Sequence, residues 1–266
     1  ERITDLVSRM TLEEKISMLH VTGPEIKRLG ILEYHYGNEA LHGIVRPGKA
    51  TVFPQAIGLA ATWDPELMFQ VATAISDEAR AKDNANNGKM TGAEEFGGQF
   101  NGLLTFFSPT VNMARDPRWG RTAETYGEDP LLTGRMGVAF IKGMQGNDKK
   151  YLKTICTPKH FVANNEEHNR FQCNVSIDEA GLRNYYLKGF EACIKEGKAG
   201  AIMTAYNAIN GIPCCVNEWL LWDILRNEWN FSGYVVTDCG AIQHLYESHR
   251  YTGDITLAAA LTINAG

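Results

Sequence analysis

The sequence predicts an α/β protein built on a parallel β-sheet, and three observations lead to that prediction. Short apolar runs alternate with helical patterns at intervals that suit βα units. Polar residues gather directly after these runs, as they do at the carboxyl ends of parallel strands. The clearest run, residues 233–240 (GYVVTDCG), is rich in β-branched residues and stops at Asp238. We therefore expect Asp238 at the end of a buried strand.

Composition allows a large core and narrows the class of partner. The chain has 266 residues, of which 44% are hydrophobic, enough for one large domain or two small ones. Its 26 basic and 31 acidic residues give a net charge of −5, which disfavours nucleic acid or an anionic membrane as the main partner. No apolar run approaches the roughly 20 residues that span a bilayer. Neutral, hydroxyl-rich ligands remain compatible with this balance.

Helices are expected where a capping residue precedes apolar residues at helical spacing. Thr11 with Glu14 forms a capping-box pattern, and Ser176 with Glu179 repeats it ahead of a helix that Gly197 ends. Two more helices are expected to begin at Asp64, which precedes a proline, and at Asn217. Their apolar faces are expected to pack in the core.

Six short apolar segments are expected to be strands. They lie at residues 31–36, near Val52, and at residues 103–107, 155–157, 201–204 and 234–237. The polar, glycine-containing stretch 82–102 is expected to be a loop or insertion within a single domain that spans residues 1–266.

Polar residues follow five of these strands. They are Asn38 and Glu39, residues 112–116, Lys159 and His160, Tyr206 and Asn207, and Asp238. A closed barrel brings all such ends into one ring, whereas an open sheet does so only in part.

Asp238 has several possible roles. A carboxylate held at a strand end can attack an anomeric carbon, take a proton or bind a metal. It can equally serve as the N-cap of the next helix. Its position alone does not choose between these roles.

Lys159 and His160 are adjacent donor-rich groups after a strand, and they suit binding of vicinal hydroxyls or stabilisation of a neighbouring carboxylate. A solvated loop is the alternative, but the apolar flanking residues indicate partial enclosure. Glu39 can accept hydrogen bonds from ligand hydroxyls, although taken alone it fits a surface charge as well.

Residues 115–121 (RDPRWGR) combine three arginines with a tryptophan. Arginine binds carboxylates or sugar hydroxyls with fixed geometry, and a tryptophan face stacks on a pyranose ring. The alternative is an internal ion-pair cluster with the acidic residues that follow, Glu124, Glu128 and Asp129. We expect most of the segment to form such a cluster and one arginine at most to reach a ligand.

The segment 164–170 contains His168 beside two glutamates, followed by Arg170. No second histidine stands at the i, i+4 spacing of HExxH sites, so no metal site is expected. The Arg170 guanidinium can reach the same pocket as Lys159 from the next loop.

Together, in this order, these segments resemble the N-terminal domain of glycoside hydrolase family 3, the exo-acting β-glucosidases and β-xylosidases. The resemblance runs from residues 10–15 (MTLEEK) through RDPRWGR, GEDP at 127–130, KHF at 159–161 and Tyr206-Asn207 to Asp238. RDPRWGR and KHF in this order are highly specific. The resemblance implies a (β/α)8-type TIM barrel. We expect it to be incomplete at its C-terminal end, because only six strands are convincing and the chain stops at Gly266, where the family usually continues into another strand.

The resemblance also implies a retaining mechanism without a cofactor, in which Asp238 is the nucleophile and forms a covalent glycosyl-enzyme that water hydrolyses. The implied pocket for the terminal sugar of an oligosaccharide or β-glycoside is lined by Glu39, Arg121, Lys159, His160, Arg170 and Tyr206. Lys159 and Arg170 would keep Asp238 ionised, and Tyr206 would form a hydrogen bond near it.

Two positions depart from the pattern of many β-glucosidases in the family, which carry an aspartate and a tryptophan where this chain has Glu39 and Cys239. This combination is similar to the β-xylosidase-like branch. A longer carboxylate reaches into the space that the C6 hydroxymethyl group of a hexose occupies. We therefore expect β-xylosides to be preferred over β-glucosides, with a β-glucosidase as the alternative.

The proton donor is the missing element. Retention requires a second carboxyl group about 5 to 5.5 Å from the nucleophile, and most of the family takes it from an α/β-sandwich domain that this chain lacks. We expect a C-terminal domain or a second chain to supply it. One branch uses a histidine in the loop after KHF, which makes His168 a candidate, but the residues around it do not match that branch.

Two other functions remain open. A sugar-binding fragment without an acid/base would keep the pocket, and an aldolase with Lys159 as Schiff base would fit the lysine but not RDPRWGR. The chain opens at Glu1 and not at Met, so a leader, if one existed, has been removed and export stays open. We expect a secreted or periplasmic location, with a cytoplasmic location as the alternative.

Overall fold

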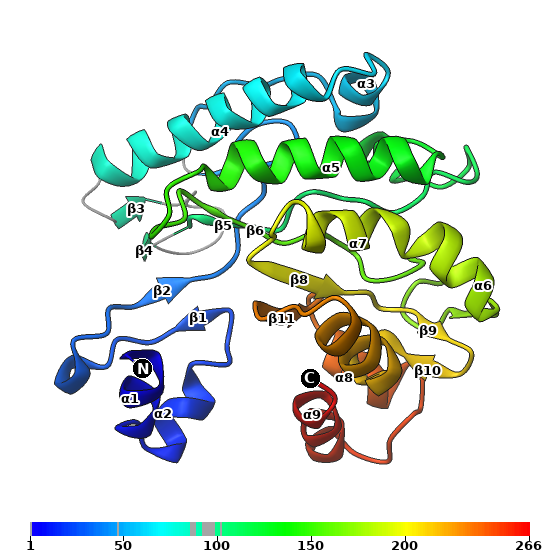
Figure 1. Ribbon diagram of the computed structural model, residues 1–266. Helices are drawn as coiled ribbons and strands as arrows, with labels where there is room; N and C mark the ends of the chain where they lie inside the picture. Colours follow the sequence, from blue (N-terminus) through cyan, green and yellow to red (C-terminus); the bar gives the residue numbers. More distant parts are fainter. Residues whose placement is uncertain (1, 47, 86–88, 92–98, 102) are drawn as a thin grey trace.

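A succession of parallel strand segments runs through the middle of the protein (Figure 1). The computed structural model describes residues 2–266 except 47, 86–88, 92–98 and 102. Strand β5 (Thr105–Phe106) pairs in parallel with β6 (Ile155–Cys156), and β8 (Ala201–Thr204) pairs in parallel with β11 (Tyr234–Thr237). Parallel bridges join these pairs into one series: Asn38 to Phe106, Thr110 to Lys159, and Phe161 to Thr204.

This series confirms the predicted parallel arrangement. Strands β8 and β11 have the boundaries expected from the sequence, and β5 and β6 lie within the expected runs. Because all the segments point the same way, the polar residues that follow them lie along one rim.

Short strand pairs flank the series. They are β1 (Thr22–Gly23) with β2 (Tyr34–His35), β3 (Lys89–Thr91) with β4 (Gln99–Asn101), β9 (Ala208–Ile209) with β10 (Ile212–Pro213), and β7 (Asn174–Val175) with β9. The first three pairs are antiparallel and the last is parallel.

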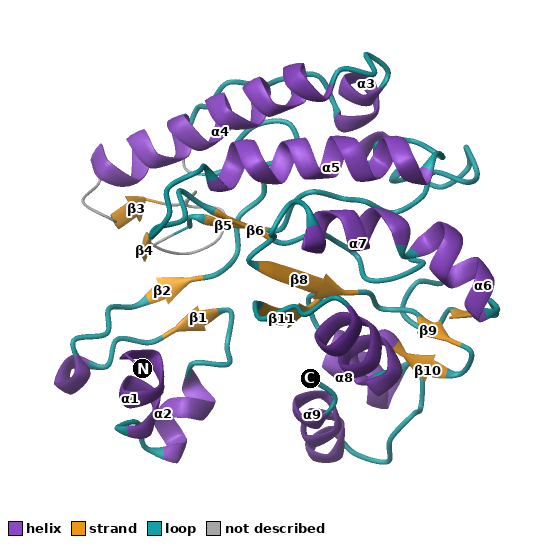
Figure 2. Cartoon of the chain, in the orientation of Figure 1, coloured by secondary structure: helices purple, strands orange, loops and turns teal. Residues whose placement is uncertain are grey.

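Helices α4 (Pro65–Ala85), α5 (Pro130–Gln145) and α7 (Lys188–Lys195) cover one side of the strands (Figure 2). The other helical elements are α1 (Arg2–Ser8), α2 (Leu12–Ser17), α3 (Ala56–Ala60), α6 (Glu179–Gly181), α8 (Ala241–Glu247), α9 (Ile255–Asn264), the π-helical η4 (Leu182–Tyr186) and η6 (Trp219–Glu228), and 3₁₀ turns η1 (Lys27–Leu29), η3 (Thr122–Glu124) and η5 (Cys214–Val216). Within the described residues, no helix combines the length and the apolar character needed to cross a membrane.

Helices α4 and α5 pack closely because residue 143 is a glycine. A Cβ atom there would lie 2.6 Å from the Phe69 carbonyl oxygen and 2.9 Å from the Thr73 nitrogen, which are backbone atoms that cannot move aside. The Ser76 hydroxyl donates to the Gly143 carbonyl at 3.0 Å across this contact. The close approach fixes the outer helical layer on the strands.

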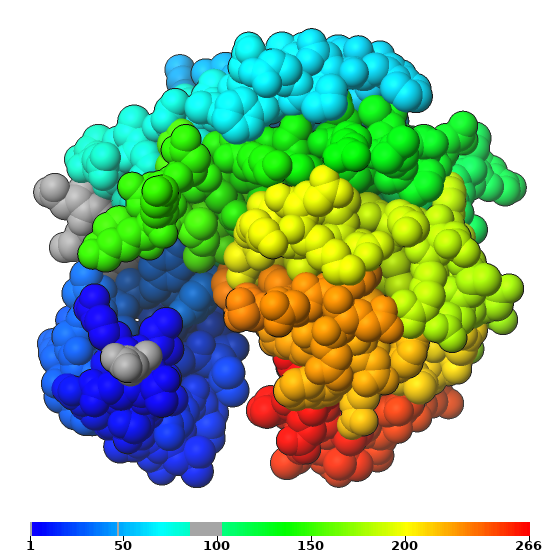
Figure 3. All heavy atoms as spheres, viewed as in Figure 1, coloured from blue at the N-terminus to red at the C-terminus, as the bar shows by residue number. Residues whose placement is uncertain are grey.

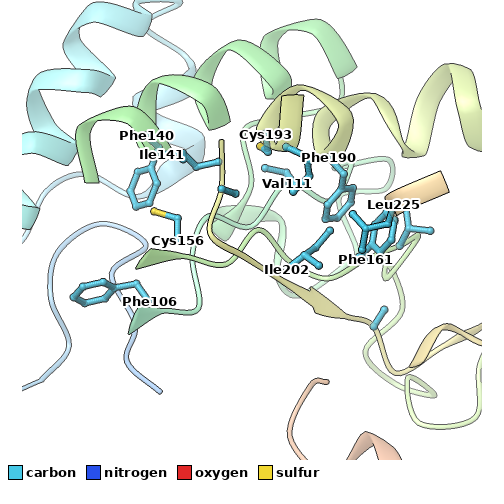
Figure 4. Packing of buried hydrophobic residues seen from close by; sticks show 14 of the residues in the cluster. Phe106, Val111, Phe140, Ile141, Cys156, Phe161, Phe190, Cys193, Ile202 and Leu225 are labelled. Carbon is cyan, nitrogen blue, oxygen red and sulfur yellow. The ribbon is translucent and has the colours of Figure 1, made fainter. Parts of the chain in front are cut away.

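The core lies between the strands and helices α5 and α7 (Figure 4). Phe106, Phe140, Phe161 and Phe190 are each 1% exposed or less. The Phe161 ring lies 5.1 Å from the ring of Phe190, between centroids, so the segment that carries Lys159 and His160 is anchored by the residue that follows it. Replacing such a residue by alanine typically costs about 3–5 kcal/mol of stability.

The predicted helix caps were mostly confirmed. Thr11 and Glu14 form the complete capping box at α2, and the Asp64 carboxylate accepts the N–H of Leu67 at the start of α4. The Asn217 side chain accepts the N–H of Leu220 ahead of η6.

The capping box expected at Ser176 was wrong. Asp178 is the N-cap of α6 and its carboxylate accepts the Gly181 N–H at 2.6 Å. The chain just before it is held in the β7 pairing, and Ile177 donates its N–H to the Asn210 side chain. The helix therefore begins at Glu179, after this pairing ends.

Two other expectations require correction. Val52 lies in irregular chain and is 76% exposed, because Thr51 donates its N–H to the Glu78 carboxylate, Phe53 donates to the His42 carbonyl, and a proline follows. The stretch 82–102 is not a simple loop: α4 continues to Ala85 and β3 pairs with β4. Residues 86–88, 92–98 and 102 of that stretch lie outside the described residues.

The expected barrel is not closed among the described residues. Strand β11 pairs with β8 along one edge, and the described chain offers no strand partner for its other edge. A cavity of about 550 Å³ lies there, lined by residues 18–21, Tyr36, Phe107 and residues 234–240. Figure 3 shows this face hollowed between the N-terminal segment, in blue, and the C-terminal segment, in orange and red.

Candidate active site

Asp238 lies where the sequence predicted, directly after β11 and at the border of this cavity. Its main-chain N–H donates to the Thr204 carbonyl at 3.2 Å, and its carboxylate Oδ1 accepts the Cys239 N–H at 2.8 Å. The N-cap of α8 is Gly240, whose φ of 77° is in the left-handed region that glycine favours. The Asp238 carboxylate therefore does not cap the helix, and its Oδ2 is directed to other groups.

The environment of Asp238 balances burial against positive charge. The side chain is 13% exposed. Burial raises its pKa, while the Cys239 N–H, the charge of Lys159, the Tyr206 hydroxyl and the charge of Arg121 oppose the rise. Such a carboxylate is partly desolvated yet surrounded by groups that favour its ionised form.

His160 faces Asp238 from the end of the β6 segment. Its Nε2 lies 3.6 Å from Asp238 Oδ2, and the residue is 2% exposed. Burial lowers its pKa well below the ordinary value, and Lys159, Arg121 and Arg170 lower it further. The ring is therefore neutral in the folded protein near neutral pH.

Lys159 and Glu39 form a partly buried ion pair. Lys159 Nζ donates to Glu39 Oε1 at 2.5 Å, and the Ser108 hydroxyl donates to Glu39 Oε2 at 3.3 Å. The Lys159 side chain is 4% exposed and that of Glu39 is 29% exposed. Burial raises the pKa of Glu39, and the charge of Lys159 opposes this. Neither group sits on a solvated surface, which was the alternative for both.

The expected ion-pair cluster between residues 115–121 and the acidic residues that follow them forms only in part, through Arg121 and Glu124. Arg121 pairs with Glu124 through two hydrogen bonds, at 3.0 and 2.9 Å, and Arg118 pairs with Asp116 on the surface. Arg115 lies over the ring of Tyr186, 5.5 Å from its centroid. Of the three arginines, Arg121 is the one whose charge is felt at Asp238.

Arg170 and Tyr206 meet beside Asp238. The Arg170 guanidinium lies 5.1 Å from the centroid of the Tyr206 ring and 4.8 Å from that of Phe171. The Tyr206 hydroxyl donates to the Cys239 carbonyl at 2.6 Å. Burial, followed by the charge of Asp238, raises the pKa of Tyr206 well above its ordinary value. The hydroxyl thus stays protonated and braces the residue after Asp238.

Three contributors were not among the predicted site residues. Glu167 accepts from Arg170 at 3.0 Å and from the Trp119 indole at 3.2 Å, so it links two predicted segments. Phe171 stacks on His244, with 4.0 Å between ring centroids. Asn112 bonds to His160 through both ends of its amide. A buried polar residue next to a strand end was the available signal for Asn112.

His168 is exposed, and its main-chain N–H donates to the Glu166 carboxylate at 2.8 Å. No hydrogen bond or ion pair joins it to Asp238 in the described part of the chain. Over the same residues, no cluster of three or more His, Cys, Asp or Glu side chains has the arrangement of a metal site.

The assembled groups suit recognition of a neutral polyhydroxylated ligand. They offer carboxylate and imidazole acceptors together with ammonium, guanidinium and phenol donors around one buried aspartate. The ion pair with Glu39 occupies the amine that a Schiff base at Lys159 would need.

Comparison with known proteins extends this result. Residues 93–266 match the glycosyl hydrolase family 3 N-terminal domain. The chain is 39% identical over 269 residues to a xylan 1,4-β-xylosidase of Xylanibacter ruminicola, and 39% identical over 287 residues to probable β-D-xylosidase 7 of Arabidopsis thaliana. Both alignments cover all of this chain but only 31% and 36% of the two relatives. The chain therefore spans about a third of their length.

Solved structures agree. A GH3 exo-β-xylosidase (XlnD), in complex with a xylobiose aziridine activity-based probe, superposes with a TM-score of 0.90 and 35% identity over 100% of this chain and 35% of its own. β-Glucosidase 3B from Thermotoga neapolitana, in complex with glucose, gives 0.77 and 30% identity over 92% of this chain and 36% of its own. The family match covers more than half of the sequence. The chain belongs to glycoside hydrolase family 3, of which it carries the N-terminal domain.

Proposed function

We propose that this chain provides the nucleophile and the sugar pocket of an exo-acting retaining β-glycosidase that removes terminal β-D-xylosyl residues. The observation that carries the proposal is the position of Asp238. Its carboxylate is 13% exposed, directly follows β11, and has His160 Nε2 at 3.6 Å. A desolvated carboxylate that main-chain hydrogen bonds hold at a strand end is placed to attack an anomeric carbon.

In the proposed mechanism Asp238 forms a covalent glycosyl-enzyme, which water then hydrolyses. Lys159, Arg121 and the Cys239 N–H oppose the effect of burial on Asp238, so they maintain the ionised nucleophile. The pocket groups Glu39, Lys159, His160, Arg121, Arg170 and Tyr206 bind and orient the sugar, which lowers the entropic cost of the attack.

The proton donor is proposed to lie outside this chain. The relatives are about three times as long, since the chain covers 31% and 36% of them. A second domain of the same protein, or another chain, would place an acid near Asp238 at the rim. We also propose that strands from outside this chain pair with the free edge of β11 and complete a barrel, which the cavity beside that edge would accommodate.

The nucleophile can be tested without the acid. A 2-deoxy-2-fluoro β-xyloside with a good leaving group needs no protonation to glycosylate the enzyme, so mass spectrometry after digestion should find the label on Asp238. Asp238→Ala should remain unlabelled, and Asp223→Ala, on η6, is the matched control that should label normally. Sugar binding without labelling of the wild-type protein would identify a binding fragment and contradict the nucleophile.

The preference for xylosides rests on Glu39. The pairing with Lys159 and Ser108 restrains its carboxylate, and we propose that this carboxylate occupies the space that the C6 hydroxymethyl group of a hexose would need. Glu39→Asp should therefore raise kcat/KM on p-nitrophenyl β-glucoside relative to the β-xyloside, by roughly tenfold for the relief of one misplaced methylene-sized group. A wild-type protein that prefers the glucoside would overturn this assignment and favour the β-glucosidase alternative.

A further inference from the structure

Asn112 holds both the main chain and the ring of His160. Its Oδ1 accepts the His160 main-chain N–H at 2.8 Å, and its Nδ2 donates to the His160 carbonyl at 2.9 Å. The same Oδ1 lies 3.0 Å from His160 Nδ1. Both residues are 2% exposed, so water has little access to these contacts.

The main-chain contacts determine which end of the amide faces the ring. An NH₂ group in place of Oδ1 would set a donor against the His160 N–H, and an oxygen in place of Nδ2 would set an acceptor against the carbonyl. The atom that faces Nδ1 is therefore an acceptor. A hydrogen bond between them requires that Nδ1 carries a proton.

A neutral ring with its proton on Nδ1 has a bare lone pair on Nε2. The groups that act on the ring are the carboxylate of Asp238, 3.6 Å from Nε2, and the cations Lys159, Arg121 and Arg170. Burial, together with these cations, lowers the pKa of His160 and keeps it neutral. Two acceptors, Nε2 and Asp238 Oδ2, then face each other, and a hydroxyl donor from a ligand satisfies this arrangement.

We propose that Asn112 is a positioning residue that holds His160 in the Nδ1–H tautomer, so that Nε2 accepts a hydrogen bond from a sugar hydroxyl beside Asp238. The role of the hydroxyl rests on the proposed function. In the opposite tautomer, Nε2–H would donate to Asp238 and tie up the carboxylate that has to attack.

Neutron diffraction from crystals of the complete protein that carries this chain would locate the proton. The expected result is a deuteron on Nδ1 and none on Nε2 of His160. A deuteron on Nε2, alone or together with one on Nδ1, overturns the proposal. This readout needs no catalysis, so it stands apart from a failure to hydrolyse or to label Asp238, which would count against the proposed function instead.

The pH profile gives a second readout. Asn112→Asp keeps the acceptor and adds a negative charge, which raises the pKa of His160 and favours the imidazolium. The acid limb of kcat/KM should move to higher pH by on the order of one unit, since an opposite charge in contact shifts a pKa by that much or more. Asn112→Leu removes the acceptor and should lower kcat/KM roughly tenfold or more at every pH.

Asn207→Asp is the matched control. Asn207 is also buried and donates to the Val162 carbonyl at 3.1 Å, in the same segment, but it does not contact the His160 ring through any hydrogen bond in the described chain. It should cost stability without moving the acid limb. If Asn112→Asp lowers the rate equally at all pH values and leaves the limb in place, Asn112 is only structural and the proposal fails.

Discussion

Strands β8 and β11 pair along their full lengths and yet differ in packing. All four residues of β8 are buried, whereas all four residues of β11 are partly exposed. Partners in register, such as Ile202 and Val235, therefore sit in different environments although both belong to apolar, β-rich runs. The difference is in what lies beside the edge of each strand that faces away from the other.

The inner strand is covered on both edges. Beyond β8 lies the segment of Phe161, which bridges to Thr204 and is itself fully buried. Beyond β11 lies the cavity next to Met18–Val21 and Tyr36. The same contrast runs through the site: Lys159 and His160 are 3% and 2% exposed, while Cys239, next to Asp238, is exposed. The proposed nucleophile thus stands on the least supported strand of the series.

The largest expected effect concerns stability on the two strands. Ile202→Ala should reduce the free energy of unfolding by about 2–5 kcal/mol, because a fully buried side chain leaves a cavity. Val235→Ala should cost only about 1 kcal/mol, because its side chain is already partly in water. Urea titrations of both variants would measure the difference.

The same pair in the complete protein sharpens the comparison. If additional strands cover β11 there, the cost of Val235→Ala should rise toward that of a buried valine while the cost of Ile202→Ala stays unchanged. If both variants lose the same free energy of unfolding in this chain, β11 is supported as well as β8, and the contrast between the two strands is wrong.

The sequence predicted both strands and could not distinguish them. Residues 201–204 and 234–237 show similar apolar patterns, and periodicity carries no information on what lies at a strand's edge. The strand predicted near Val52 was wrong for the converse reason. The β-branched side chain of Val52 favours a strand, but the main-chain N–H groups of its two neighbours donate to the Glu78 carboxylate and the His42 carbonyl and not to a partner strand. Pairing is decided by groups distant in sequence.

Asp238 and His160 should give stability opposite dependences on pH. Burial raises the folded-state pKa of Asp238 above its ordinary value of 3.8, so between the two values the folded state binds more protons and stability falls as pH rises. Burial lowers the folded-state pKa of His160 below 6.5, so stability falls as pH drops below 6.5. Burial of Asp238 therefore costs stability as pH rises above 3.8, and burial of His160 costs stability as pH falls below 6.5.

Asp238→Asn tests the pH dependence predicted for the Asp238 carboxyl group. The variant should gain stability relative to the wild type as pH rises from about 4 to 7, measured from urea midpoints at a series of pH values. Asp148→Asn is a control of opposite sign, because main-chain N–H groups of Lys150 and Tyr151 lower the pKa of that surface carboxylate. Relative to the wild type it should lose stability as pH rises through the interval just below 3.8, where the folded-state and unfolded-state pKa values differ, and change little from there to about pH 7. A parallel response of the two variants would contradict the burial argument for Asp238.

The site was predictable as a set of segments, because each of its main groups follows a strand or lies in the loop after one. What the sequence could not supply were the contacts between segments. Glu167 joins Trp119 to Arg170, and Asn112 joins His160 from 48 residues away. The position of Asn112 after a strand is visible in the sequence, but the partner of either residue is not, since any buried amide or acid on a loop looks alike until the strands bring it to a particular neighbour.

The smallest expected effect comes from the contact that steadies the exposed side of the site. The Tyr206 hydroxyl donates to the Cys239 carbonyl at 2.6 Å and so restrains the chain directly after Asp238. Tyr206→Phe removes this hydrogen bond and should cost about 1 kcal/mol of stability. It should also lower kcat/KM severalfold, because the carboxylate on the weakly supported strand loses part of its positioning.

Tyr185→Phe is the matched variant for that measurement. Its hydroxyl also donates to a main-chain carbonyl, that of Glu128, at 2.9 Å, but it lies on an exposed surface away from the cavity beside β11. It should leave kcat/KM unchanged. If both variants lose stability to the same extent but only Tyr206→Phe loses activity, the hydroxyl acts at the site, through the position of Asp238 or through the bound sugar, and not through the fold. Equal activities would mean that Asp238 is held by β8 and the Cys239 N–H alone, and that the free edge of β11 is less of a weakness than its exposure suggests.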